Sequence, residues 1–230
     1  IGNMLTNCAR GIFVNGTATP GINGDNVITG NTNGVYLTTG TPQPVVTGNQ
    51  IFGNTTNNFF ADTFAAGAQN LVINATGNWW GTTDPTTIAA DIVDLTDDYA
   101  ATDRPTVNYA NFLNGPGGAP ITGNYLQGRV AASGSLLANT VYDVLGVYIV
   151  NSGATLTIPA GTTLRFHANA TFVVDGVVNI QGTSTSPVTL TSGRAPPARD
   201  NWPGVLVRAN GSLIEYARIE YTSTAVNVAG

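Results

Sequence analysis

The chain has 230 residues, of which 42% are apolar and only 9% are charged, and its formal net charge is −5. This length and apolar content support a continuous buried core and argue against a disordered chain. The basic residues are all Arg and are scattered, so we expect no nucleic-acid partner, and no apolar run reaches the roughly 20 residues of a membrane span. Thr, Asn, Ser and Gly must solvate the surface in place of charges, which is typical of an extracellular or cell-surface protein.

Short β-branched segments, each followed by a Gly-Asn turn, recur along the chain. Val27-Ile28-Thr29-Gly30-Asn31 and Val45-Val46-Thr47-Gly48-Asn49 have this form, and Ile121-Thr122-Gly123-Asn124 repeats it later. Val, Ile and Thr favour strands, while Gly and Asn tolerate the left-handed backbone of a sharp corner. Gly48 follows Gly30 at a shorter interval than Gly77 follows Gly48, which predicts a solenoid with a loose repeat.

An antiparallel sandwich is the alternative fold for such strands. Alternation of apolar residues with Thr, as in Thr155-Leu156-Thr157-Ile158, fits a half-buried strand of either fold. Asn33-Gly34 is a hairpin-type turn, but the segments around it lack the paired spacing of a meander. We therefore predict an all-β fold, a parallel β-helix (β-solenoid), with the sandwich as the second choice.

One short helix is expected near residues 85–93. Asp84 can cap its N-terminus, Pro85 suits its first turn, and Ile88 and Ile92 have helical spacing. Further along, residues 114–120 are rich in Gly and Pro and are expected to form a linker or a crossing loop.

A family resemblance begins at Asn78-Trp79-Trp80-Gly81, which is followed by Asp84-Pro85. This segment resembles the closing segment of right-handed parallel β-helix repeat proteins with the pectate-lyase-like fold, which are surface proteins of bacteria and archaea. Residues 1–113 resemble the late coils and closing segment of such proteins. Residues 121–230, which contain the segment from Gly153 to Thr162, resemble the opening coils. The resemblance therefore implies a circularly permuted order, with residues 114–120 between the two parts.

The permuted order has two interpretations. The 230 residues resemble one repeat of a tandem array, or two consecutive β-helical domains that are each cut short. Under both, a coil stack without a cap exposes unpaired strand edges, which are a template for the next unit. We expect copies of the chain to assemble head-to-tail through residues near its two ends, which are Ile1, Gly2, Val226, Val228 and Gly230.

Candidate binding chemistry is sparse. Four carboxylates that lie close together in the sequence suit Ca²⁺, with solvated turns or helix caps as the alternative role; they are Asp91, Asp94, Asp97 and Asp98. No other cofactor is expected. Five sequons are candidate glycosylation sites, at Asn15, Asn54, Asn74, Asn169 and Asn210.

Other polar and aromatic residues are expected to have structural roles. The single histidine, His167, ends a strand, where we expect a surface or turn position. Arg218 and Glu220 can share one face of a strand as an ion pair. The tryptophans at 79, 80 and 202 could bind sugars, but packing against a loop or a coil end is the favoured role.

The sequence favours a structural protein and not an enzyme. It contains no Lys that could act as a base, and no carboxylate pair has an obvious glycosidase spacing. We predict a structural subunit or repeat module of an extracellular filament, sheath or surface stalk. The alternatives are an adhesin or carbohydrate-binding module, with glycans as partners, and a polysaccharide lyase. Ice binding by rows of Thr is disfavoured by the loose repeat.

Overall fold

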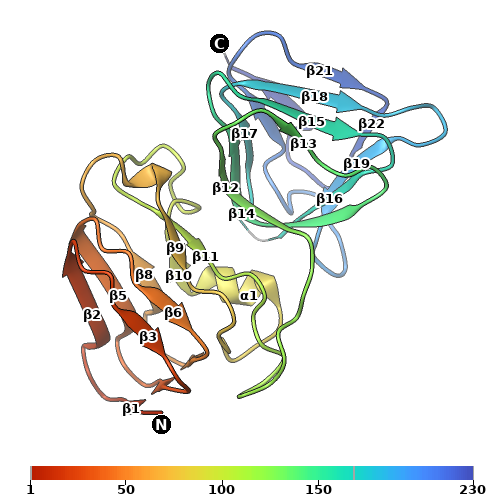
Figure 1. Cartoon of the computed structure of the whole chain (residues 1–230). Coiled ribbons are helices and arrows are strands. Elements are labelled where there is room, and N and C mark those ends of the chain that lie inside the picture. Colours follow the sequence, from red (N-terminus) through yellow and green to blue (C-terminus); the bar gives the residue numbers. More distant parts are fainter. Residues whose placement is uncertain (1, 168, 230) are drawn as a thin grey trace. The chain divides into compact units, whose positions relative to one another are not determined.

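The computed structural model describes residues 2–167 and 169–229, and the chain divides into two compact units, residues 1–123 (unit 1) and residues 124–230 (unit 2). Parallel β-strands dominate both units (Figure 1). No helix in the described part of the chain is long and apolar enough to cross a membrane. The predicted all-β, right-handed parallel β-helix is confirmed.

Unit 1 is a stack of coils. Strands of successive coils pair in parallel and form three sheets. The three resulting sheets have the orders β1-β4-β7, β2-β5-β8-β10 and β3-β6-β9-β11. The strands are β1 (Met4–Leu5), β2 (Arg10–Gly16), β3 (Gly21–Asn23), β4 (Val27–Ile28), β5 (Asn33–Gly40), β6 (Val45–Thr47), β7 (Gln50–Ile51), β8 (Asn57–Ala61), β9 (Val72–Asn74), β10 (Ile92–Val93) and β11 (Thr106–Asn108). Met4 pairs with Val27 and Arg10 with Asn33, so the sequence separation between these neighbouring coils is 23, as it is between Asn26 and Asn49.

Buried asparagines fix two corners of these coils. At one corner Asn26 Nδ2 donates to Asn49 Oδ1 (2.7 Å), and Asn49 Nδ2 donates to Asn78 Oδ1 (3.2 Å). At the other corner Asn31 donates to Asn54 Oδ1 at 3.1 Å. The Gly-Asn turns at 30–31 and 48–49 therefore belong to different corners. The interval between them is therefore not a coil step, but the predicted loose repeat is confirmed, because Asn26 and Asn49 on adjacent coils are 23 residues apart and Asn49 and Asn78 are 29 apart.

The closing segment of unit 1 contains the predicted helix, α1 (Pro85–Ala90), and a 3₁₀ turn, η1 (Ala68–Asn70), lies before it. The Asp84 side chain accepts hydrogen bonds from the backbone N–H groups of Thr86 and Thr87, as an N-cap should. The helix ends at Ala90 and not at residue 93, because Ile92 pairs with Phe59 as part of β10.

Residues 114–120 form a tight loop, in which the Asn114 N–H donates to the Ala119 carbonyl at 2.9 Å. The predicted boundaries at 113 and 121 stay predictions.

Unit 2 repeats the parallel coil with longer strands. One sheet has the order β13-β15-β18-β21, and a larger one runs β22-β19-β16-β14-β17-β20-β23, with β12 also paired to β14. The strands are β12 (Tyr125–Val130), β13 (Gly134–Ser135), β14 (Val141–Val150), β15 (Thr155–Pro159), β16 (Thr163–Phe166), β17 (Phe172–Val174), β18 (Val177–Gln181), β19 (Val188–Ser192), β20 (Val205–Val207), β21 (Leu213–Glu215), β22 (Ala217–Ile219) and β23 (Val226–Val228).

Alternation of side chains fills the core of unit 2. In β15, Leu156 and Ile158 are buried while Thr155 and Thr157 lie on the outer side, as the sequence pattern predicts. Equivalent inward residues stack from coil to coil, such as Leu164 on Leu190. Trp202 and Phe166 stack with their ring centroids 4.0 Å apart, and this pair extends the core toward the last coil.

Candidate functional site

The first coil of unit 1 has an open edge. Strands β1, β2 and β3 are each the last strand of a sheet, and no strand in the described residues pairs with their outer edges (Figure 1). The inward residues of this coil are incompletely covered: Leu5 and Ile12 are half-buried, whereas Ile28 and Val35, which stack on them, are fully buried. Val14 and Ile22 of the same coil are buried, so the described residues leave part of this end of the core uncovered.

The last coil of unit 2 has the same property. Strands β21, β22 and β23 end their series, and the described chain continues to Ala229 without adding a further coil. Ile214 and Ile219 pack against the core but stay half-buried, whereas Ile180 and Leu190 in the coil before them are fully buried. Both open ends are thus sheet edges next to incompletely covered apolar residues, a combination that favours the addition of another coil.

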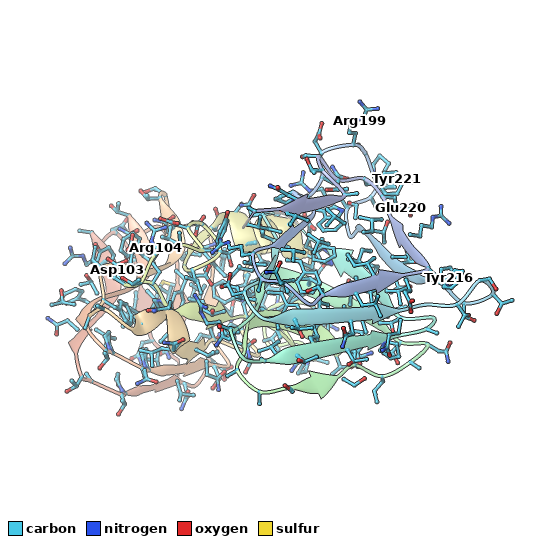
Figure 2. The ribbon with its side chains drawn as sticks, turned by 90° about the horizontal axis from the view of Figure 1, so that it is seen from above. Asp103, Arg104, Arg199, Tyr216, Glu220 and Tyr221 are labelled. Atoms are coloured by element: carbon cyan, nitrogen blue, oxygen red, sulfur yellow. The ribbon has the colours of Figure 1, made fainter. Side chains whose placement is uncertain are left out.

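Exposed apolar side chains gather on these two coils. Ten large apolar side chains are exposed among the described residues, and six of them belong to the first or the last coil: Met4, Phe13, Leu213, Tyr216, Tyr221 and Val228. Figure 2 shows Tyr216 and Tyr221 on the last coil, together with Glu220. Single exposed apolar residues need no explanation, but their concentration at two sheet edges indicates contact surfaces.

Three of the five predicted assembly residues lie in the described structure. Gly2 is exposed and approaches Asp25 so closely that a Cβ atom would collide with its carbonyl oxygen. Val226 is half-buried against the core of unit 2, and Val228 is 76% exposed. Ile1 and Gly230 lie outside the described residues. Nothing in the geometry tests an assembly role for these residues, and that role stays a prediction.

The backbone of β23 shows which groups are available at its edge. Val205 donates its N–H to the Ala225 carbonyl, and Ala229 donates to the Val207 carbonyl. Because backbone groups alternate in direction along a strand, those of Val226 and Val228 point away from β20 and toward the open edge. These groups can bond to an added parallel strand.

An aromatic column runs along the outer face of unit 1. Phe13 pairs with Tyr36, and Tyr36 with Phe60, on adjacent strands. The Tyr36 and Phe60 rings stack with centroids 4.4 Å apart. At the open edge, the Arg10 guanidinium lies 4.7 Å from the Phe13 centroid and 4.2 Å from that of Tyr36. These contacts hold the Arg10 charge against the rings.

A charged column occupies the outer face of unit 2. Asp143, Arg165 and Thr191 pair in register on successive coils, and Arg165 Nη2 lies 2.6 Å from Asp143 Oδ2. Glu220 continues the column, because its Oε1 accepts a hydrogen bond from Thr191 Oγ1 at 3.0 Å. Arg218 Nε lies 2.7 Å from Glu220 Oε2, which confirms the predicted ion pair. The column ends with a carboxylate at the open edge.

His167 is buried, so the expected surface position was wrong, but the expected turn position is confirmed, because the Ala170 N–H donates to the His167 carbonyl at 3.1 Å. Its Nε2 lies 2.9 Å from Asp143 Oδ1, one coil earlier. Burial pushes the pKa of Asp143 up, but hydrogen bonds from His167 and Arg165 outweigh it and hold this pKa below its ordinary value. The ring of His167 also lies against Gly193, where a Cβ would come within 2.8 Å of it. His167 therefore contacts the coil before its own, through Asp143, and the coil after it, through Gly193.

The four predicted calcium ligands are each hydrogen-bonded within unit 1. Asp94 is buried, and its two oxygens accept the N–H groups of Thr96 and Val107, both at 2.7 Å. Burial raises the pKa of Asp94 to about 6 in spite of these bonds. The others accept hydrogen bonds as follows: Asp91 from Asn58, Asp97 from the Asp94 N–H and Asp98 from the Ala100 N–H. No three His, Cys, Asp or Glu side chains in residues 2–167 and 169–229 form a group that could hold a metal. Calcium binding stays an untested prediction.

Four of the five candidate glycosylation sites have exposed asparagines, which are Asn15, Asn74, Asn169 and Asn210. Asn54 differs, because its Nδ2 donates to Asn58 Oδ1 at 2.9 Å and to the Ile28 carbonyl at 3.1 Å. A glycan is attached through this nitrogen, so modification of Asn54 would break a corner of the coil. Occupancy of all five sites stays a prediction.

The tryptophans pack as the sequence favours. Trp80 and Trp202 are buried, and Trp79 is half-buried. Trp202 Nε1 also donates to the Glu220 carbonyl at 3.0 Å, which ties the core to the last coil. An open pocket of about 260 Å³ lies beside it, lined by Asn169, Arg194, Asp200, Asn201, Trp202, Pro203 and Ser223. Buried rings offer no broad face to a sugar, and the adhesin and lyase alternatives stay untested.

Comparison with known families supports the fold assignment of unit 2. Residues 128–212 match the family model described as a pectate-lyase like beta helix domain. The match covers about a third of the chain and includes β14 to β20. It confirms the resemblance to pectate-lyase-like parallel β-helix proteins. Neither the curated proteins nor the solved structures gave a significant match.

Proposed function

We propose that this protein is a structural subunit or repeat module of an extracellular filament, sheath or surface stalk, in which copies stack head-to-tail through the ends of their β-helices. The observation that carries this proposal is the presence of two uncovered coil ends, one on β1, β2 and β3 and one on β21, β22 and β23. A last coil and a first coil have different surfaces, so their contact is heterologous. Repeated contacts of this kind produce a filament when the rotation between copies does not close a ring.

The apolar pattern of the two ends supports this arrangement. Leu5 of β1 can stack on Ile214 of β21, and Ile12 of β2 can stack on Ile219 of β22, as inward residues of adjacent coils do within each unit. Each of these side chains points inward and is half-buried at its own open end. Stacking would complete the burial of four apolar side chains and pair the exposed backbone edges of the strands. An extracellular location is proposed on the low charge and Thr- and Asn-rich surface alone.

Electron microscopy of the purified chain tests this proposal. We expect fibres at rising protein concentration, with β-strands continuing from one copy to the next. Val228→Pro removes an N–H that faces the open edge, and proline is tolerated on an edge strand, so this variant should stay folded and fail to form fibres. Val228→Ala is the matched control, because it keeps the N–H and loses only the exposed side chain. Discrete monomers of the unmodified chain at every concentration would overturn the proposal.

A further inference from the structure

The outer face of the junction carries opposite charges at its two ends. On the last coil, the Glu220 side chain is about a quarter exposed and lies beside Thr191 and Arg218. On the first coil, Arg10 is exposed and makes no ion pair with any acidic group in the described structure. We propose that these two residues form an ion pair between successive copies, which sets the register of the head-to-tail contact. This inference rests on the proposed function.

Stacking of the inward residues would bring these groups together. If Ile12 of β2 in the next copy stacks on Ile219 of β22, Phe13 lies beside Glu220, because these two residues come next in the sequence. The Arg10 guanidinium lies 4.7 Å from the Phe13 ring centroid and 4.2 Å from that of Tyr36, one coil further from the junction. It therefore lies on the outer face, next to the residue that Glu220 would meet.

The charges follow a pattern that unit 2 already uses. Asp143 and Arg165 pair on adjacent coils with their charged atoms 2.6 Å apart. Glu220 ends this column with a carboxylate, so a cation of the next coil can continue the pattern. Phe13 occupies the next position of the column, and the Arg10 guanidinium over its ring supplies that cation. The Phe13 and Tyr36 rings hold its guanidinium in place, which reduces the side-chain freedom lost on pairing.

The carboxylate of Glu220 can accept this additional partner. One oxygen accepts from Arg218 Nε and the other from Thr191 Oγ1. Each carboxylate oxygen has two lone-pair sites, so a second guanidinium can bind without displacing either contact. Glu220 would then lie between Arg218 of its own copy and Arg10 of the next. A charge pair of this kind favours one register over others, because in a shifted register Glu220 lacks its partner from the next copy.

Charge reversal tests the pair on the full chain, with assembly followed by light scattering and electron microscopy at low salt. We expect Arg10→Glu and Glu220→Arg each to raise the protein concentration required for assembly about fivefold, since each places like charges together. The double variant should return this concentration to within about twofold of the unmodified chain. High salt should reduce the differences.

Glu215→Arg is the matched control. Glu215 is exposed on β21 of the same coil, and stacking of Leu5 on Ile214 places it beside Thr6 and not beside Arg10. It makes the same charge change at the same end, and combining it with Arg10→Glu should not restore assembly. Glu220→Gln is a milder variant for the case in which Glu220→Arg does not fold, because the amide oxygen can accept from Arg218 Nε while the amide nitrogen donates to Thr191 Oγ1. It should weaken assembly, and less than charge reversal does.

The outcomes separate this inference from the proposed function. If the unmodified chain forms fibres but the single variants assemble equally well, or the double variant does not recover, the ion pair is wrong and head-to-tail stacking stands. Equal recovery with Glu215→Arg would also contradict the pairing, because it would show that only net charge matters. If the unmodified chain forms no fibres, both proposals fail.

Discussion

The two units build the same parallel coil with different side-chain contacts between coils. Beside its own apolar core and one ion pair, between Arg104 and Asp62, unit 1 uses buried neutral amides: Asn26, Asn49 and Asn78 bond from coil to coil at one corner. Unit 2 uses a continuous apolar core with ion pairs on its outer face, such as Arg165 with Asp143 and Arg208 with Asp175.

Strand length gives a reason for this difference. In unit 1, β1, β4 and β7 have only two residues each, so few ladder hydrogen bonds fix their register. An asparagine side chain at the adjacent corner can donate one hydrogen bond and accept another. These amide contacts between coils therefore provide a second constraint on the register of the short strands. In unit 2, β14 has ten residues and pairs with two later strands, so its backbone fixes the register without such help.

The largest effect that separates the units should come from removing a buried amide. Asn49 is fully buried, and its Nδ2 donates to the Ile22 carbonyl at 2.7 Å while its Oδ1 accepts from Asn26. Asn49→Ala leaves these buried groups without partners, so we expect the free energy of unfolding of unit 1 to fall by about 3 kcal/mol, with little change in unit 2. Urea titration read out by hydrogen exchange of peptides from each unit measures both values.

Asn33→Ala is the control for that experiment. Asn33 also accepts from an asparagine of the next coil, Asn57, at 3.2 Å, but both side chains are only half-buried. Water can replace this contact, so the loss should stay below about 1 kcal/mol. Equal losses for Asn33→Ala and Asn49→Ala would show that the contribution of these amide hydrogen bonds to stability does not depend on their burial.

The pH should affect the two units in opposite directions. Burial raises the pKa of Asp94 in unit 1 to about 6, from an ordinary value of 3.8. A raised pKa favours folding below the ordinary value, and this contribution disappears as the pH rises through the folded value. We therefore expect Asp94 to reduce the free energy of unfolding of unit 1 by up to about 3 kcal/mol between about pH 4 and pH 7.

Asp143 in unit 2 should show the reverse dependence. Its pKa lies below the ordinary value, so its contribution is present above that value and disappears as the pH falls through the folded value. Urea titrations at several pH values between about 3 and 7, with the same peptide readout, measure both trends. Asp94→Asn should reduce the change in unit 1 and leave unit 2 unaltered; a smaller change should remain in unit 1, because burial also raises the pKa values of Asp91 and Asp97. A pH profile of unit 1 that is the same with and without this substitution would contradict the assignment.

The fold could be predicted because its signals are local. β-branched segments with Gly-Asn corners identify strands and turns, and Asp84-Pro85 identifies the start of α1 without tertiary information. The end of α1 was missed because Ile92 fits helical spacing and strand β10 equally well. Only its pairing with Phe59 decides between them.

Contacts between coils were harder to predict. The turns at Asn31 and Asn49 have the same local sequence, and only bonding to Asn54 and Asn78 assigns them to separate corners. A search for asparagines that recur at a constant separation, as Asn26 and Asn49 do, would have revealed the coil length. The burial of His167 depends on Asp143, which lies one coil earlier and has no distinguishing sequence motif.

The smallest effect that separates the units should come from salt. Arg165 pairs with Asp143 at 2.6 Å, but its side chain is 48% exposed, so water and ions screen the pair. Arg165→Ala should lower the free energy of unfolding of unit 2 by about 0.5 kcal/mol at about 0.01 M salt and by almost nothing at about 1 M. Arg199→Ala is the control, because Arg199 is exposed and forms no ion pair among the described residues. The loss in the Asn49→Ala variant should not depend on salt, because its hydrogen bonds join neutral groups. If salt removed that loss as well, charge would contribute to both units, and the distinction between amide ladders and ion pairs would fail.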